Sequence, residues 1–389
     1  MSETASERRR LPPLRFAIPG LVGLWAIAFE IPRFVGLVES DPGLNDFRLF
    51  YLVAQAGLKW GWSSMYDPAR LHELGLALGR PADAVINAAY AYEYSPLLAW
   101  LVAPLTILSL PAAFYIWTAV NIAALVAAWW LASPGAGFAR LAVLLVSLAI
   151  WPTVFAFERG QPVFITFALA TGCWWMASSR REVWAGVLLA LAWAIKPQDV
   201  TLLPVVLVLC GLWRAAAWWL LTTAALSAIF ALTLGPTGIG TYLAVLAWSA
   251  SDPNYTSSTL ITPFGSFATL LVAQAAFAVV ALAGVWRHRR SLRLAFAIGI
   301  VGTLVSAIHL HEYDYVGLVF AAWLALGEPT SAVEIAWLAI GIVCAQLPSI
   351  GVRLPIVFWQ PVWLVMLSLR GASVSAGRLR LWYMRSAPP

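Results

Sequence analysis

Apolar stretches about as long as a membrane-spanning helix recur along the whole chain, and this recurrence constrains the fold more than any other feature. Of the 389 residues, 61% are hydrophobic and 11% are charged, a charged share well below that of a soluble domain. No polar segment is long enough for a separate soluble domain. We therefore interpret residues 1–389 as one all-α, integral-membrane domain, because helices satisfy their own backbone polar groups in lipid.

The hydrophobic pattern predicts a polytopic membrane protein with about twelve transmembrane helices and both termini inside. A further apolar stretch, 96–110, is short and contains Pro104, so we interpret it as a non-crossing or re-entrant helix. Counting it as a crossing would place the arginine-rich loops outside, against the preference of Lys and Arg for cytoplasmic loops. The number of transmembrane helices is left open by one, according to whether this stretch crosses. The predicted spans are 14–37, 112–132, 140–157, 163–179, 183–197, 199–213, 216–235, 263–286, 293–310, 314–327, 332–347 and 354–369.

The first outer loop, residues 37–95, is the one long hydrophilic insertion. Aromatic and aliphatic residues recur at near-helical spacing over 46–60 and 69–79, which predicts short amphipathic helices at the membrane surface. Asp67 and Pro68 mark a turn between them, and a second predicted turn is Gly79-Arg80-Pro81.

The net charge of +6 does not indicate a nucleic-acid partner, because the basic residues are scattered through short loops. They indicate orientation instead, since Lys and Arg favour cytoplasmic loops. With this topology the polar clusters all emerge on the non-cytoplasmic side. They are Asp46, Glu158 to Gln161, Lys196 and His309 to Asp314.

Asp46 follows the first predicted span and has two interpretations that are compatible with each other. It is a favoured residue type for capping a surface helix. A carboxylate at the rim of an apolar cavity also has a raised pKa and can accept a proton from an attacking hydroxyl, as a general base.

The segment Glu158-Arg159-Gly160-Gln161 places two opposite charges between two apolar helices. A local ion pair between Glu158 and Arg159 that ties the turn is one interpretation. Charges at membrane depth also commonly line a cavity. In that case Arg159 would bind a phosphate and Gln161 a sugar hydroxyl.

Lys196 ends another predicted helix on the same side, followed by Pro197 and Gln198. A lysine at a helix end commonly extends to lipid headgroups. A cation in this turn is also well placed to hold an anionic leaving group such as phosphate, which is the interpretation we prefer.

The segment from His309 to Asp314 is the densest polar cluster and contains His311. A metal is weighed here, because His and carboxylates are ligands, but the spacing fits no helix-borne metal motif. The remaining interpretations are a structural hydrogen-bond network between helices and a cluster that orients the substrate or transfers protons. We predict no metal site.

Several ordered motifs resemble glycosyltransferase family 87, of the C-type glycosyltransferase superfamily. The likeness covers roughly residues 40–320. Two departures are Ser95, where a second proline is usual, and the region after about 330, which shows no matching motif. The motifs are Asn45 to Tyr51, Met65 to Pro68, Tyr94-Ser95-Pro96-Leu97, Ala103-Pro104-Leu105, Leu110-Pro111, Gly160-Gln161, Ala185 to Ala190, Ile195-Lys196-Pro197 and His309 to Asp314.

The resemblance implies a membrane hexosyltransferase, mannosyltransferase-like, that uses a polyprenyl-phosphate-linked sugar as co-substrate and needs no further cofactor. It implies Asp46 as catalytic base, with the segment from His309 to Asp314 beside the donor. We expect inversion at the anomeric carbon, with Lys196, Arg159, Gln161, His309, His311 and Asp314 contacting donor or phosphate. The expected partners are a lipid-linked donor, a lipid or glycan acceptor and membrane lipids.

We expect the protein in a bacterial plasma membrane, with its site on the non-cytoplasmic side and a role in building cell-envelope glycolipids. A transporter or flippase for a lipid-linked or anionic solute is the alternative, because buried charges also line translocation paths. A third option is a polymerase or ligase of surface polysaccharide.

Overall fold

The computed structural model describes residues 14–40, 46–77, 92–249 and 267–371, and these residues form helices joined by turns, with no strand among them. The predicted all-α fold is confirmed for this part of the chain. The turn predicted at Gly79-Arg80-Pro81 lies outside the described residues.

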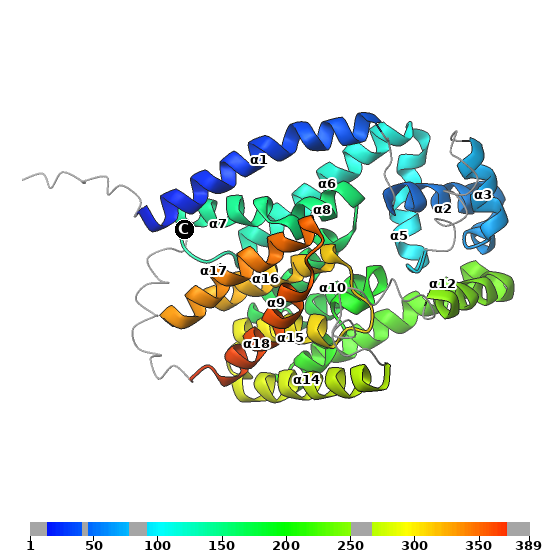
Figure 1. Cartoon of the computed structure of the whole chain (residues 1–389). Helices are drawn as coiled ribbons and strands as arrows, with labels where there is room; N and C mark the ends of the chain where they lie inside the picture. The colour runs from blue at the N-terminus through cyan, green and yellow to red at the C-terminus, as the bar shows by residue number, and fades with distance from the viewer. Residues whose placement is uncertain (1–13, 41–45, 78–91, 250–266, 372–389) are drawn as a thin grey trace, which may run out of the picture.

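The helices form a bundle with a smaller group of helices, α2, α3 and α5, at one end (Figure 1). The first part of the chain contains α1 (Leu14–Ser40), α2 (Asp46–Trp60), η1 (Trp62–Ser64), α3 (Pro68–Ala77), α5 (Pro96–Val102), η2 (Ala103–Ile107), α6 (Leu110–Ala132), α7 (Gly137–Ala149), α8 (Trp151–Arg159) and α9 (Val163–Ser178). The second part contains α10 (Glu182–Ile195), η3 (Pro197–Asp199), α11 (Leu203–Leu209), α12 (Trp213–Ser249), α14 (Phe267–His288), α15 (Leu292–Ser306), η5 (Glu312–Tyr315), α16 (Val316–Leu326), α17 (Ala332–Gln346), η6 (Leu347–Ile350) and α18 (Leu354–Leu369).

Five described helices are long and apolar enough to cross a membrane, and α7 with α8, bent by 60°, would make a sixth. A helix covers all or part of each of the twelve predicted spans, but the count of about twelve crossings is not confirmed. The reason is length: α9, α10, α15 and α18 contain 16, 14, 15 and 16 residues. At about 1.5 Å per residue such helices are shorter than a hydrocarbon core of roughly 30 Å.

The helices enclose two buried apolar clusters. The larger cluster joins α9, α10, α15, α16 and α18, and the smaller one joins α2, α3, α5 and the first half of α6. Phe47 and Phe50 of α2 are fully buried in the smaller cluster. The two clusters meet at the turn between α8 and α9, where Gly160 packs against Phe47.

The helices predicted over 46–60 and 69–79 correspond to α2 and α3. The environment of α2 differs from the expectation of a helix lying on a membrane surface, because most of its residues are buried, whereas only Leu71 and Gly75 are buried in α3. The 3-10 helices η1 and η2, together with α3 and α5, pack around α2. The residues of α2 are therefore part of the packed interior.

Gly160 fixes the position of the turn between α8 and α9. Its φ of 66° lies in the left-handed region, and a Cβ added there would lie 2.6 Å from Cβ of Phe47 and 2.9 Å from Cε2 of Phe114. The indole Nε1 of Trp117 donates a hydrogen bond of 2.7 Å to the Gly160 carbonyl. The turn is therefore held against α2 and α6, which places Gln161 beside the first turn of α2.

We expect Gly160→Ala to destabilise the protein by roughly 2–4 kcal/mol, because strain from the left-handed conformation adds to overlap with Phe47 and Phe114. Thermal unfolding of the purified chain in detergent measures this loss. Gly211→Ala is the matched control, since Gly211 has a φ of 76° and nothing lies within 4 Å of its added Cβ. Equal losses in the two variants would contradict the proposed close packing at Gly160.

Candidate functional site

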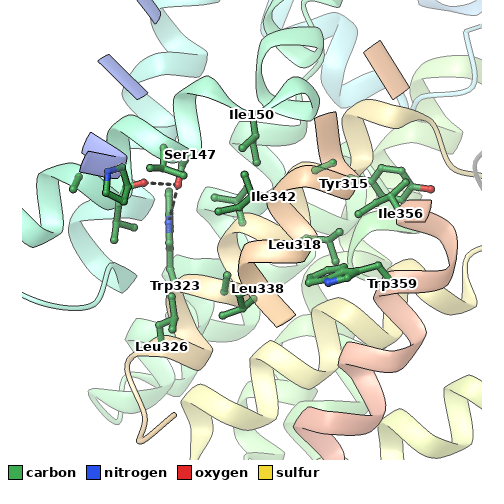
Figure 2. Close-up of a pocket in the computed structure, with 18 residues that line it drawn as sticks. Ser147, Ile150, Tyr315, Leu318, Trp323, Leu326, Leu338, Ile342, Ile356 and Trp359 are labelled. Atoms are coloured by element: carbon green, nitrogen blue, oxygen red, sulfur yellow. Dashed lines mark hydrogen bonds between the residues drawn. The ribbon is translucent and has the colours of Figure 1, made fainter. Parts of the chain in front are cut away.

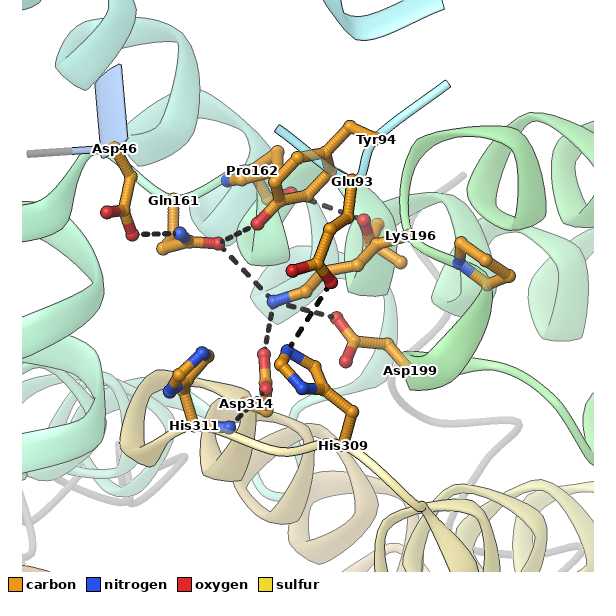
Figure 3. Close-up of polar contacts among 12 residues, drawn as sticks. Asp46, Glu93, Tyr94, Gln161, Pro162, Lys196, Asp199, His309, His311 and Asp314 are labelled. Atoms are coloured by element: carbon orange, nitrogen blue, oxygen red, sulfur yellow. Dashed lines mark hydrogen bonds and ion pairs between the residues drawn. The ribbon is translucent and has the colours of Figure 1, made fainter. Parts of the chain in front are cut away.

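Four side chains from distant parts of the chain form a connected polar cluster (Figure 3). Asp46 is the first residue of α2, Gln161 lies in the turn before α9, Lys196 follows α10, and Asp314 belongs to η5. Each occupies a helix end or a short turn, where side chains can point inward without disturbing a helical apolar face. We call these four residues the polar cluster.

The charged centre of the polar cluster is the ion pair between Lys196 and Asp314. The ammonium Nζ contacts Asp314 Oδ1, and the two side chains are 1% and 0% exposed. Asp314 Oδ2 accepts a hydrogen bond of 2.7 Å from the backbone N–H of His311. Lys196 therefore points into the protein, and the interpretation that it extends to lipid headgroups is wrong.

Asp199 lies on the other side of Lys196, with its Oδ2 3.9 Å from Nζ. It is fully buried, and neither of its carboxylate oxygens has a hydrogen-bond partner in the structure. Burial raises the pKa of Asp199 well above its usual value, Lys196 opposes this shift, and Asp314 reinforces it. One ammonium cannot balance two buried carboxylates, so we assign the neutral form to Asp199 and the charged form to Asp314.

The amide of Gln161 connects the ion pair to Asp46. Its Nε2 donates to Asp46 Oδ2, and its Oε1 accepts from Lys196 Nζ at 3.3 Å and from the Tyr94 hydroxyl at 2.9 Å. Gln161 is buried and uses both ends of its amide within the protein. Both acceptor positions of its carbonyl are therefore occupied, and only the second N–H of the amide has no partner among the described residues for the predicted contact with a sugar hydroxyl.

Asp46 is only half-buried, unlike the other three members of the polar cluster. Burial raises its pKa above the usual value, while Arg159, the hydrogen bond from Gln161 and Lys196 act in the opposite direction. Its Oδ2 is held by Gln161, and its Oδ1 has no partner among the described residues. A carboxylate with one oxygen fixed and the other free can accept a proton from a bound hydroxyl.

His309 and His311 border the polar cluster, and their rings lie 4.9 Å apart, edge to face. His309 Nε2 is 3.9 Å from Glu93 Oε2, and the His311 ring lies 5.0 Å from that of Tyr313. Burial lowers the pKa of each histidine to about 4, so both are neutral at physiological pH. Neutral imidazoles both donate and accept hydrogen bonds, which suits polar ligands.

Arg159 lies at the edge of the same site, over the ring of Phe155 at 4.8 Å. It is close enough to lower the pKa of Asp46, and it forms no ion pair with any described residue. Glu158 pairs with Arg33 of α1, so the predicted local ion pair between Glu158 and Arg159 is wrong. Arg159 is thus a cation near Asp46 that forms no ion pair within the described part of the chain, a suitable partner for an anionic ligand.

Sequence reasoning missed three contributors, Tyr94, Asp199 and Glu93. Asp199 comes three residues after Lys196, and that spacing was the available signal. Tyr94 and Glu93 come directly before the Ser95-Pro96 motif, and no local pattern distinguishes them from other aromatic and acidic residues of the first outer loop.

An apolar cavity of about 210 Å³ lies between α1, α7, α16, α17 and α18 (Figure 2). Ile150 and Tyr315 lie toward one end and Leu326 toward the other. Tyr315, one of the lining residues, directly follows Asp314 in the sequence. The rings of Phe155 and Tyr313 stack at 5.9 Å.

The sequence-family model of glycosyltransferase family 87 matches residues 92–310, which is more than half of the chain. The match includes Tyr94, Arg159, Gln161, Lys196 and His309, whereas Asp46, His311 and Asp314 lie outside it and are tied to it by the contacts above. No curated protein and no solved structure matches the chain.

The charge assignment predicts different costs for two isosteric substitutions. Asp314→Asn removes the charged partner of buried Lys196, so we expect a loss of about 2–4 kcal/mol in unfolding free energy. Asp199→Asn replaces a neutral carboxyl with a neutral amide, and we expect a loss below about 1 kcal/mol. Thermal unfolding of both full-length variants tests this, and a larger loss for Asp199→Asn would reverse the assignment.

Proposed function

The chain belongs to glycosyltransferase family 87, and on this premise we propose that it moves a hexose from a polyprenyl-phosphate-linked donor to an acceptor hydroxyl. Family membership and the apolar helices make it a membrane glycosyltransferase. We propose mannose as the sugar, a lipid or glycan as the acceptor, and the non-cytoplasmic face of a bacterial plasma membrane as the site of reaction.

The observation that carries this proposal is the state of Asp46, a half-buried carboxylate with a raised pKa and one free oxygen. In the proposed step, Asp46 Oδ1 takes the proton of the acceptor hydroxyl as its oxygen attacks the anomeric carbon. The bond from that carbon to the phosphate oxygen breaks, and the lipid phosphate leaves with the electron pair. A single displacement inverts the anomeric centre.

The contacts of Lys196 and Arg159 suggest that these two cations have different roles. Lys196 is already paired with Asp314, so its charge is compensated before any donor arrives. Arg159 has no ion-pair partner among the residues that the structure describes and lies over the Phe155 ring, so its guanidinium is available for the departing phosphate. We propose Arg159 as the main phosphate ligand, with His309 and His311 as neutral groups that orient the sugar or phosphate.

The apolar cavity supports a lipid-linked donor. It is lined by side chains such as Leu318, Leu338 and Ile342, and also by Tyr315, which directly follows Asp314 in the sequence. We propose that the first part of the polyprenyl chain lies there, packed against these apolar side chains. A chain in this cavity would hold its phosphate near Phe155 and Arg159.

Asp46→Asn tests the base. Loss of a general base typically lowers the rate by about 10²–10⁴, so we expect no detectable transfer from radiolabelled polyprenyl-phosphate mannose by membranes that contain the variant. Equal expression and an unchanged unfolding temperature confirm that the variant is folded. Near-normal turnover would remove Asp46 from the mechanism, and a labelled donor that changes sides without a new glycolipid would favour a flippase.

Ala322→Trp tests the cavity by filling it. We expect KM for the full-length lipid donor to rise about tenfold, equivalent to about 1.4 kcal/mol of lost chain binding, with kcat much less affected. Ala119→Trp is the matched control, since Ala119 is exposed on α6 and does not line the cavity. A donor with a short, soluble chain should show little change, and an unchanged KM for the long donor would contradict the assignment.

A further inference from the structure

Gln161 lies between a carboxylate and an ammonium, and these two neighbours determine the orientation of its amide. Lys196 only donates hydrogen bonds and ionised Asp46 only accepts them. The carbonyl oxygen must therefore face Lys196, and the NH₂ group must face Asp46, as the structure has them. The opposite orientation would place the NH₂ group against the Lys196 ammonium, two donors, and the carbonyl oxygen against the Asp46 carboxylate, two acceptors.

Tyr94 reinforces this orientation from a third direction. Its hydroxyl donates 2.9 Å to the same Gln161 oxygen, and burial raises the pKa of this phenol well above its usual value, so it keeps its proton. The hydroxyl of Tyr66 donates to the Tyr94 backbone carbonyl at 2.7 Å, which fixes the segment that carries Tyr94. Two donors thus converge on one amide oxygen, which leaves the NH₂ group on the side of Asp46.

We propose that Gln161, held in a single orientation by Tyr94 and Lys196, is a positioning residue that presents Asp46 to the acceptor with Oδ2 occupied and Oδ1 free. This inference rests on the proposed function, in which Asp46 is the base. It replaces a role for Gln161 in binding sugar and assigns to Tyr94 a role that sequence reasoning did not give it.

The hydrogen bond also favours the reactive charge state. The NH₂ group of Gln161 binds an ionised carboxylate more strongly than a protonated one, because charge-assisted hydrogen bonds are the stronger kind. It therefore keeps Asp46 ready to accept a proton and helps it lose that proton after transfer. Other groups also shift the pKa of Asp46, and the contribution of Gln161 is one among these. The charged or titratable groups near Asp46 are Arg48, Tyr94, Arg159, Lys196, Tyr313 and Asp314.

The test compares pH profiles of kcat and KM for the full-length enzyme and two variants, Gln161→Leu and Tyr94→Phe. In Gln161→Leu we expect the acidic limb of kcat/KM to move up by about one pH unit or more, since the carboxylate loses a hydrogen bond to its charged form. We expect kcat at neutral pH to fall about 10- to 100-fold, with KM for the donor changed less than about threefold. Tyr94→Phe should shift the limb in the same direction but less, because Lys196 still holds the amide.

Tyr51→Phe is the matched control for Tyr94→Phe. It also removes a buried hydroxyl, one that donates 2.7 Å to the Leu108 carbonyl, and it touches no member of the polar cluster. We expect a wild-type acidic limb in this variant. A shift as large as that of Tyr94→Phe would mean that any lost hydroxyl in this region has the same effect, and would overturn the inference.

A readout that does not need activity protects the test against an inactive variant. Infrared titration of the carboxyl band that is absent from Asp46→Asn reports directly on protonation of Asp46, and it should move to higher pH in Gln161→Leu. If Asp46→Asn is inactive but neither the band nor the acidic limb moves, this inference alone fails. A raised KM for the donor with an unmoved limb would instead return Gln161 to sugar binding, and an active Asp46→Asn would remove the proposed function itself.

Discussion

The buried ion pair between Lys196 and Asp314 is the interaction on which the rest of the site depends. Removing an ammonium and a carboxylate from water is unfavourable unless further hydrogen bonds complete their coordination. Here these come from Gln161 and from the backbone of His311, so the pair determines where α8, α10 and η5 meet. Among the described residues, the hydrogen bond from Gln161 connects the Asp46 carboxylate to this arrangement, so the orientation of that side chain depends on residues far from it in sequence.

The architecture explains why so much charge can lie in so apolar a chain. The helices α9, α10 and α15 are short for membrane-spanning segments, and the polar side chains lie in the turns at their ends. The larger apolar cluster ends at these turns, and the smaller cluster around α2 covers them from the other side. Gln161, Lys196 and Asp314 are thus buried, and electrostatic interactions among them are stronger than in water.

Local signals in the sequence predicted the helical elements well and their long-range partners poorly. The helix over 46–60 was predicted with its observed bounds, and the span predicted to end at 235 stops where Gly235 and Pro236 break α12. Of the two interpretations of the segment from Glu158 to Gln161, the local ion pair is excluded, because Glu158 pairs with Arg33, 125 residues earlier in the sequence. Lys196 and Gln161 were recognised as candidates, but nothing local indicates that Asp314, 118 residues later, neutralises the lysine.

The charges of the site suggest why a carboxylate suits the proposed reaction. Before transfer the donor phosphodiester and Asp46 each carry one negative charge, and afterwards the lipid phosphate carries two while Asp46 is neutral. The net charge of the site does not change in this step, so the reaction only moves negative charge from Asp46 toward the phosphate. A fixed cation closer to the phosphate than to Asp46 then favours the transition state over the ground state, which is the condition for electrostatic catalysis. Arg159, which has no ion-pair partner among the described residues, is suited to that position, whereas Lys196 is compensated by Asp314 and instead keeps Gln161 directed at the base.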